Sequence, residues 1–525
     1  MKLSLESFSG YLRNLKSLCR EFDLPLAGDR RESEKQVILK AWEKWDTDAG
    51  NHLFGAFSFV IRNCDANELF CVRDQLGLEQ LYYCLTGTGR ILAASDILTI
   101  RNDPEYKTGI DGEALQTYLM FGYAAGEKTL FRGIRKLPPG CCLVFANGTA
   151  RINPYYSFRF RPERGLSEDA WCDRIEETAK TVIAEDAETN AGKPSVSFLS
   201  SGVDSSWLLS LCGAGTAVSV GYGACHSDET TEAQETAKTL GRGFVRKIVT
   251  AEEYFDALPV LCRGVEMPLA DASSPAFCLG CREASRSADF CYSGEGPDEF
   301  FAGYRLYRRC AELALDGGPL HFGCFGLMAE ETARELLGYA VSRFDGPGLV
   351  SRIYRDTADG EHLSRLLSID IRLYFEGDIL FNLSRNAKAN GLTVAAPFAD
   401  PRMLELSATI PSALKLRDGQ GKYIFRKAAA RGIPHQTAFR EKKGFPIPLS
   451  DWMRNESIRE RMEAVLFGSS SRMFFDQNLI RRWWSVYLSG NRSPSYMLYG
   501  IYLFLIWYET CYSLNLANLA GTVPA

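Results

Sequence analysis

Short runs of apolar residues recur along the chain, and in its first third they predict antiparallel strands. Gly55–Ile61, Glu68–Val72 and Leu81–Tyr83 are rich in β-branched and aromatic residues and are separated by Asn, Asp and Gly turns. Ser7–Leu26 reads as an amphipathic helix followed by a loop, and Glu32–Trp45 reads as a second helix. We therefore expect a sheet with helices on one side.

The middle of the chain alternates predicted strands with predicted helices. Such an alternation is typical of a parallel, doubly wound sheet, so we expect an α/β fold there. The strands are expected at Ser195–Leu199, Ala217–Gly221 and Arg246–Val249, and the helices at Glu168–Ala184 and Glu232–Leu240.

The polar segment Phe158–Leu166 interrupts the β-rich pattern and predicts a domain boundary. A chain of 525 residues exceeds what one core usually serves, so at least two domains are expected. We place them at residues 1–160 and 161–525. The apolar run Tyr496–Tyr508 is too short to span a bilayer and predicts a buried helix.

Composition narrows the class of protein. A net charge of −5 gives no overall basic field for nucleic acid. The 16 cysteines are too few for a disulfide scaffold and no secretory leader is seen, so we expect a cytoplasmic protein with reduced thiols. Cys278 and Cys281 form a lone CxxC without a second pair, which favours ordinary thiols over a zinc site.

A turn of small residues follows the strand Ser195–Leu199. Ser200, Ser201 and Gly202 let backbone amides approach a ligand closely, and a helix beginning near Asp204 would direct its positive end there. This combination suits phosphate, with magnesium bridging Asp204 to a polyphosphate. An ordinary strand–turn–helix corner with a Ser or Asp cap fits the same residues equally well when they are taken alone.

A second glycine-rich acidic turn, Ser293–Glu299, follows a short apolar strand at Cys291. Ligands of open α/β sheets gather at the carboxyl ends of neighbouring strands, so the two turns are expected to face each other across one crevice. Asp204 and Asp298 would then share one magnesium ion.

These segments resemble a known family. SSGVDSS resembles the pyrophosphate loop of adenylating amidotransferases, and SGEGPDEFFAGY is similar to a segment of asparagine synthetase. REKKGFPIPLSDW and the aromatic close from Trp483 to Tyr508 resemble the C-terminal part of bacterial asparagine synthetases. The resemblance implies a PP-loop synthetase domain of the adenine nucleotide α-hydrolase type, which uses ATP and Mg²⁺ to form an amide bond. β-Lactam synthetases and lasso peptide cyclases are relatives of this family.

The resemblance also implies roles for single residues. Glu295 would hold the incoming amine and accept its proton, although it would equally cap the following helix. Lys442, in the REK segment, would meet the phosphate oxygens in the transition state. Leu199 and Val220 fall where the family contacts adenine, and their types fit core positions just as well. Pyrophosphate is assigned to Ser200, Ser201, Gly202 and Ser205, and magnesium to Asp204 and Asp298. Gly294, in the second turn, is assigned to binding of the nucleotide cofactor.

The first 160 residues resemble a class II glutaminase domain, of the Ntn-type α+β fold, through GAFSFVI, VRDQLGLEQLYY, Ala94–Asp96 and LPPG. In that family a cysteine directly after the initiator methionine attacks glutamine. Here the chain begins Met1-Lys2-Leu3, the first cysteine is Cys19 in a predicted helix, and the RGPD-type and NGE segments are absent. We therefore expect a truncated domain without glutaminase activity. We expect its unpaired sheet edge or uncovered face to be covered by a second copy of the chain, in a homodimer, or by another partner.

Residues 377–400 depart from the family. Where the family reads roughly GDILLKADKMSMAHSLELRVPFLD, this chain reads GDILFNLSRNAKANGLTVAAPFAD, with Ser384, Thr393 and Ala395 in place of Asp, Glu and Arg. The paired loss of Glu and Arg is either the neutral removal of a salt bridge or the mark of a changed acid pocket.

Three hypotheses remain open. The first is an AMP-forming amide ligase that adenylates aspartate or a related acid and uses free ammonia. The second is a biosynthetic ligase or cyclase that joins a substrate amine to an adenylated carboxylate. The third is a catalytically dead paralogue, against which the intact Asp204, Glu295, Asp298 and Lys442 argue.

Overall fold

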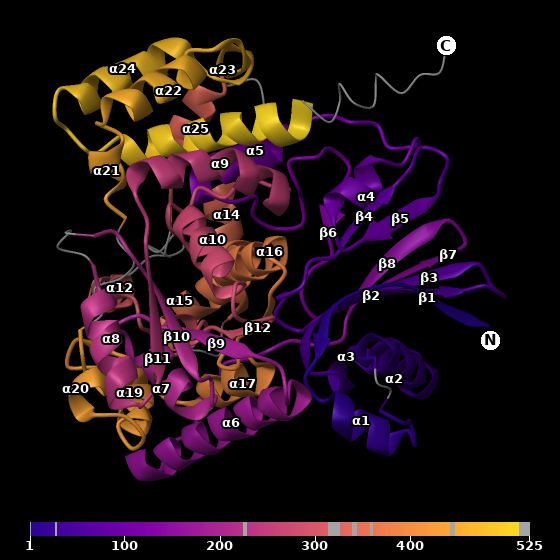
Figure 1. Ribbon diagram of the computed structural model, residues 1–525. Coiled ribbons are helices and arrows are strands. Elements are labelled where there is room, and N and C mark those ends of the chain that lie inside the picture. The colour runs from indigo at the N-terminus through magenta and orange to yellow at the C-terminus, as the bar shows by residue number, and fades with distance from the viewer. Residues whose placement is uncertain are drawn as a thin grey trace.

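The computed structural model describes residues 2–26, 29–223, 228–312, 326–338, 344–357, 361–441 and 447–513. It has a mixed α/β architecture, with antiparallel sheets in the N-terminal part and a parallel sheet in the rest (Figure 1). No helix within these ranges is long and apolar enough to cross a membrane.

The N-terminal part is built on a five-stranded antiparallel sheet of order β1-β2-β3-β7-β8. Two helices cover one face around a core that includes Trp42 and Phe59, and a three-stranded sheet of order β5-β4-β6 adjoins a smaller core around Leu143. The elements are β1 (Leu3–Leu12), α1 (Leu15–Glu21), α2 (Arg30–Trp45), η1 (Asp46–Asp48), α3 (Ala49–His52), β2 (Gly55–Asn63), β3 (Glu68–Arg73), β4 (Tyr82–Leu85), β5 (Ile91–Ala94), β6 (Arg135–Lys136), β7 (Cys141–Ala146) and β8 (Thr149–Pro154).

The prediction of a helix and loop over Ser7–Leu26 is wrong in its first part. Ser7 to Leu12 belong to β1, which pairs along its length with β2, and the helix α1 begins only at Leu15. The segment is a strand because β2 supplies hydrogen-bond partners for its backbone. The spacing of apolar residues within the segment gives no information about these distant partners. The three strands predicted from the sequence correspond to β2, β3 and β4.

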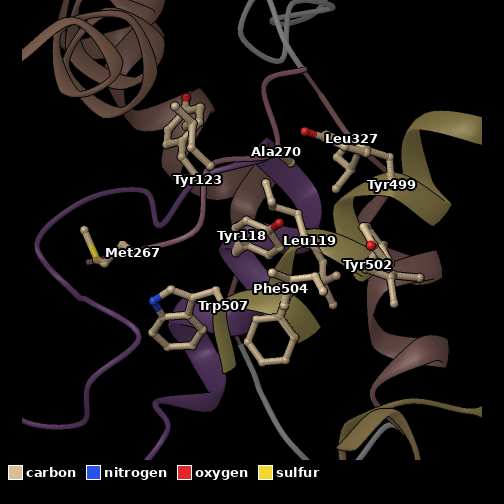
Figure 2. Close-up of a cluster of buried hydrophobic side chains, with 14 of the residues drawn as sticks. Tyr118, Leu119, Tyr123, Met267, Ala270, Leu327, Tyr499, Tyr502, Phe504 and Trp507 are labelled. Carbon is tan, nitrogen blue, oxygen red and sulfur yellow. The ribbon is translucent and has the colours of Figure 1, made fainter. Parts of the chain in front are cut away.

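Of two helices in the N-terminal part, α5 (Gly112–Phe121) lies beside the C-terminal helix α25 (Ser495–Trp507), and α4 (Ile97–Arg101) adds Ile97 and Ile100 to the same core. Figure 2 shows their shared core, in which Tyr118 and Tyr123 gather with Tyr502, Phe504 and Trp507. The Tyr118 hydroxyl donates to the Gly500 carbonyl at 2.8 Å. The predicted C-terminal helix is thus confirmed as a buried element.

The rest of the chain carries a five-stranded parallel sheet of order β11-β10-β9-β12-β13, with helices on both sides (Figure 1). This order confirms the predicted doubly wound sheet. The chain reverses its direction of progress between β9 and β12, which is the topological switch point where such sheets bind ligands. The strands are β9 (Ser195–Phe198), β10 (Thr216–Gly221), β11 (Gly243–Ile248), β12 (Phe290–Tyr292) and β13 (Thr393–Ala395).

Helices and two short strands complete this part of the chain. Figure 1 shows α6, α7 and α17 on one side of the parallel sheet and α10 and α16 on the other. The elements are α6 (Glu168–Thr189), α7 (Val203–Leu211), α8 (Thr230–Thr239), α9 (Ala251–Val265), α10 (Ser273–Ala284), α11 (Pro297–Phe300), α12 (Arg305–Glu312), α13 (Glu330–Leu336), α14 (Gly346–Asp356), α15 (His362–Asp370), the π-helix η2 (Ile371–Leu380), α16 (Phe381–Ala389), α17 (Pro401–Thr409), α18 (Ser412–Lys415), β14 (Leu416–Arg417), β15 (Gln420–Gly421), α19 (Tyr423–Ala429), α20 (His435–Ala438), α21 (Leu449–Trp452), α22 (Glu456–Leu466), α23 (Ser469–Phe474), α24 (Gln477–Leu488) and the π-helix η3 (Tyr508–Ser513).

Candidate active site

The two turns predicted from the sequence meet at the switch point. β9 and β12 are adjacent parallel strands, with Ser195 opposite Phe290 and Ser197 opposite Tyr292. Gly294 lies so close to the start of α7 that a Cβ atom there would be 3.0 Å from the Ser205 nitrogen. The second turn therefore needs glycine at this position to reach the first.

The serine-rich turn is held by its own side chains. The Ser200 nitrogen donates to the Ser205 hydroxyl at 3.0 Å, and the Gly202 nitrogen donates to the Ser200 hydroxyl at 3.1 Å. Ser201 points elsewhere, because its hydroxyl donates to Glu229 at 2.8 Å. The α7 helix begins at Val203 with no side-chain cap, so its first backbone amides lie beside this turn.

A lysine lies where the two predicted magnesium ligands converge. The Lys422 ammonium is 2.6 Å from the Asp204 carboxylate and 2.7 Å from the Asp298 carboxylate, and the lysine side chain is only 1% exposed. Nothing in the sequence around Lys422, a lysine between a glycine and a tyrosine, singled it out. Its partners are distant in the chain, so only the fold reveals this contact.

The backbone around Lys422 is constrained. Lys422 adopts a left-handed conformation with φ of 58°, and Ala302 does the same with φ of 61°. At Gly303 a Cβ atom would lie 1.9 Å from the Asp298 carboxylate and 2.1 Å from the Lys422 side chain. Non-glycine residues rarely hold such φ values, and they persist only where the surroundings enforce them.

Three carboxylates of the second turn lie close together. The Ser293 hydroxyl donates to Glu295 at 3.2 Å, and the Tyr304 hydroxyl donates to Glu299 at 2.5 Å. Burial, and then the charge of Asp298, raises the pKa of Glu299 well above its usual range. The second turn therefore contains one buried carboxyl whose pKa is shifted toward the protonated form, and perturbed pKa values of this kind are common at functional sites.

A cavity of about 510 Å³ lies in front of the two turns. Leu199 and Val220, the two residues predicted to contact adenine, line this cavity. Phe198, Val218 and Phe277 are further apolar residues of its lining. The cavity is also lined by the predicted residues Ser200, Gly202, Asp204, Ser205, Gly294, Glu295 and Asp298. Ser201 is buried behind this wall, and Lys442 lies outside the described residues.

The three departures from the family pattern do not line this cavity. Ser384 is buried and lies 3.5 Å from Glu79 of the N-terminal part, while Thr393 and Ala395 belong to β13. The neighbours of Ser384 on the helix, Asn382 and Leu383, are the residues that reach the cavity wall. Sequence reasoning overlooked Asn382, although the family sequence has lysine at its place.

Comparison with protein families decides the class of this site. A family model described as asparagine synthase matches residues 184–509, and one described as a glutamine amidotransferase domain matches residues 5–156. The chain belongs to the asparagine synthase family. It is accordingly an ATP-dependent carbon–nitrogen ligase by class.

Several relatives match most of the chain. The glutamine-hydrolyzing asparagine synthetase 1 of Bacillus subtilis (strain 168) is 26% identical over 544 residues, covering 96% of this chain and 85% of that protein. A putative glutamine-hydrolyzing asparagine synthetase of Mycobacterium tuberculosis (strain ATCC 25618 / H37Rv) is 27% identical, covering 91% of this chain and 80% of that protein. Amidase chyE of Penicillium rubens is 22% identical, covering 80% and 73%.

Proposed function

We propose that this member of the asparagine synthase family adenylates a carboxylic acid with ATP and transfers ammonia to the acyl-adenylate, releasing pyrophosphate and AMP. One observation carries the proposal. The carboxylates of Asp204 and Asp298 converge on the Lys422 ammonium at the switch point, beside the serine-rich turn and on the same cavity as Glu295. This arrangement would provide a polyphosphate site and a proton acceptor in one cavity.

The first step joins the acid to the nucleotide. An oxygen of the substrate carboxylate attacks the α-phosphorus of ATP, the bond from that phosphorus to the bridging oxygen breaks, and pyrophosphate leaves. The amides and hydroxyls of Ser200, Gly202 and Ser205 would bind pyrophosphate, and the Lys422 ammonium would balance charge beside it. Leu199 and Val220 would pack against adenine.

Asp204 and Asp298 fit a magnesium ion. One oxygen of Asp204 is buried and has no hydrogen-bond partner in the described part of the chain, which suits a cation. The described residues contain no group of three or more metal-binding side chains, and Mg²⁺ is usually held by one or two carboxylates together with substrate phosphates. The ion would neutralise charge on the phosphates.

The second step forms the amide. The nitrogen attacks the acyl carbon, the bond from that carbon to the AMP oxygen breaks, and a proton leaves the nitrogen. Glu295 lies on the cavity wall and would accept this proton. Lys442 would contact the phosphate oxygens, a role that stays a prediction from the family resemblance.

Free ammonia is the nitrogen source that we favour. A thiol that attacks glutamine needs a lowered pKa, whereas burial raises the pKa of five cysteines in the N-terminal part. These are Cys19, Cys71, Cys84, Cys141 and Cys142. The sixth, Cys64, is exposed in the turn after β2.

The test is pyrophosphate release from ATP and magnesium, with an acid present or absent and with ammonium or glutamine. Acid-dependent release with ammonium and not with glutamine is the expected result, and Asp204→Asn should abolish it. Equal release with glutamine would overturn the choice of ammonia. Failure to bind ATP would overturn the proposed function and favour a catalytically inactive paralogue.

A further inference from the structure

A second cavity of about 440 Å³ adjoins the first through Asp271 and Ser273, which line both. We infer that the acid pocket continues into this second cavity and takes an acid that bears an ammonium group and an apolar or aromatic side chain, such as an apolar amino acid, rather than aspartate. This inference rests on the proposed adenylation chemistry and adds the class of acid.

The wall between the two cavities is fixed in place. Asp271 accepts a hydrogen bond from the Ser273 nitrogen at 2.8 Å and another from the Ser273 hydroxyl. The Tyr254 hydroxyl donates to the Ala272 carbonyl at 2.8 Å, and the Ala270 nitrogen donates to the Gly122 carbonyl at 2.7 Å. Asp271 is therefore presented to a ligand by a rigid segment.

A buried acid, Asp378, interacts electrostatically with Asp271. Asp378 is fully buried, and neither of its carboxylate oxygens has a hydrogen-bond partner among the residues that the structure describes. Burial raises the pKa of Asp378 well above its usual range, and the charges of Asp271, Glu299 and Glu295 add to this effect. The neighbouring carboxylates shift Asp378 toward its neutral form, so a further anion would add to their mutual repulsion, whereas a cation would relieve it.

Cations that would pair with a second substrate carboxylate are scarce here. Among the described residues that line the two cavities, Arg305 is the only lysine or arginine, and its side chain is 72% exposed and paired with Glu441 at 2.6 Å. Asn382, on the same wall, is neutral and lies 3.5 Å from Asp271. A dicarboxylic acid would thus meet carboxylates, whereas an ammonium group would be stabilised.

The second cavity is lined by both apolar and polar residues. Leu327, Ile447, Tyr496 and Met497 supply the apolar side chains, and Asp271, Ser273 and Ser493 supply the polar ones. The Leu327 backbone nitrogen donates a hydrogen bond to the Met120 carbonyl at 2.8 Å, and the Leu327 side chain packs on Gly500. Leu327 thus belongs to the core shown in Figure 2. With the carboxylate at ATP and the ammonium near Asp271, an apolar side chain would extend into this space.

The experiment measures pyrophosphate release by the full chain with ATP, magnesium and ammonium, and with phenylalanine, methionine, leucine or aspartate as the acid. We expect at least tenfold faster release with an apolar amino acid than with aspartate. Met497→Trp, which would fill the second cavity, should reduce release with phenylalanine at least tenfold. The matched control Leu488→Trp, at a side chain 49% exposed on α24, should leave it unchanged.

Two further variants test the inference if Met497→Trp does not fold. Asp271→Asn should raise the KM for phenylalanine, and Asn382→Lys should shift the preference toward aspartate. Faster release with aspartate than with every apolar acid would overturn the inference and leave the proposed function intact. Loss of ATP binding would instead remove the proposed function, and the inference with it. ATP binding that depends on Asp204, without release for any apolar acid, would also overturn the inference.

Discussion

Lys422 is the residue on which the geometry of the site depends most. It is 1% exposed and bridges two carboxylates that approach each other from different turns. Its removal would leave the buried carboxylate of Asp298 and the mostly buried carboxylate of Asp204 facing each other, and breaking a buried ion pair typically costs about 3–5 kcal/mol.

We therefore expect Lys422→Met to lower the free energy of unfolding by about 3 kcal/mol or more, and magnesium chloride to restore part of that loss. Urea unfolding with and without magnesium measures both effects. The control is Lys180→Met, which removes an exposed pair with Glu176 and should change stability by less than about 0.5 kcal/mol. Equal losses in the two variants would contradict this role of Lys422.

Gly303 is a second residue whose identity the site enforces. A methyl group there would collide with Asp298 and with Lys422. Gly303→Ala should displace both groups and reduce acid-dependent pyrophosphate release on the order of 100-fold, because misplaced phosphate-binding groups lose transition-state stabilisation. Gly215→Ala, at a glycine with open space around it, should have no effect on this rate. Similar activities of the two variants would refute the prediction.

Because the Lys415 side chain is buried, we predict that it makes the free energy of unfolding depend on pH. Its side chain is fully buried and its ammonium lies 4.9 Å from the centre of the Phe160 ring. Its nitrogen has no hydrogen-bond partner among the described residues. Burial lowers the pKa of Lys415 to about 7. Between pH 7 and its unfolded pKa of about 10.4, the unfolded state binds more protons, so this group makes stability rise with pH.

Lys415→Met should therefore stabilise the protein most near pH 7, and the advantage should shrink as pH rises, by up to about 1.4 kcal/mol per unit. Urea unfolding of both proteins at pH 7, 8 and 9 checks this. A difference that is constant over this range would contradict it.

At the scale of elements, the end of β1 connects the N-terminal part to the rest of the molecule, which its sequence did not indicate. Arg13, just beyond the strand, donates to Asp186 of α6 at 2.8 Å and contacts Asp400 at the start of α17. All three side chains are buried, so this ion-pair group joins the N-terminal part to two helices beside the parallel sheet.

Arg13→Met should lower the free energy of unfolding by about 3–5 kcal/mol, because it leaves two buried carboxylates without their shared cation. Thermal or urea unfolding measures the loss. Arg20→Met, at an exposed arginine on α1, provides the comparison and should be nearly neutral. A change below about 1 kcal/mol for Arg13→Met would show that the two parts do not depend on this contact.

The sequence predicted those elements whose signals are local. β9, β10 and β12 were recognisable because each is a short segment with apolar or alternating residues that ends at a glycine or just before a serine turn. Ser7–Leu12 was assigned to a helix because the residues that make it a strand lie in β2, some fifty positions further on. Strand pairing of this kind depends on tertiary contacts that periodicity does not encode.

At the scale of the whole molecule, the site lies where the parallel sheet reverses direction, and the N-terminal part packs beside it. Arg73 of β3 bonds to Glu376 of η2 at 2.9 Å, and Lys136 of β6 contacts the same carboxylate at 3.2 Å. The N-terminal part thus supports the helices η2 and α16, of which Asn382 and Leu383 reach the cavity.

The two turns of the site were predictable from the sequence, whereas other residues of the site were recognised only in the folded structure. The two turns were found because small residues and carboxylates follow predicted strands, a local pattern with a clear chemical meaning. Lys422 and Asn382 come from separate segments, and only folding brings Lys422 to Asp204 and Asp298 and Asn382 to the cavity. Each is an ordinary residue in its own sequence neighbourhood.

The central claim is that the acid becomes bonded to the α-phosphorus of ATP before the nitrogen attacks. It is tested most directly with phenylalanine or aspartate carrying ¹⁸O in both carboxylate oxygens, incubated with ATP, magnesium, ammonium and the enzyme, followed by mass spectrometry of the nucleotide. Adenylation predicts AMP with one ¹⁸O atom in its phosphate and unlabelled pyrophosphate. Label in inorganic phosphate with ADP as the product, or unlabelled AMP, would contradict the account.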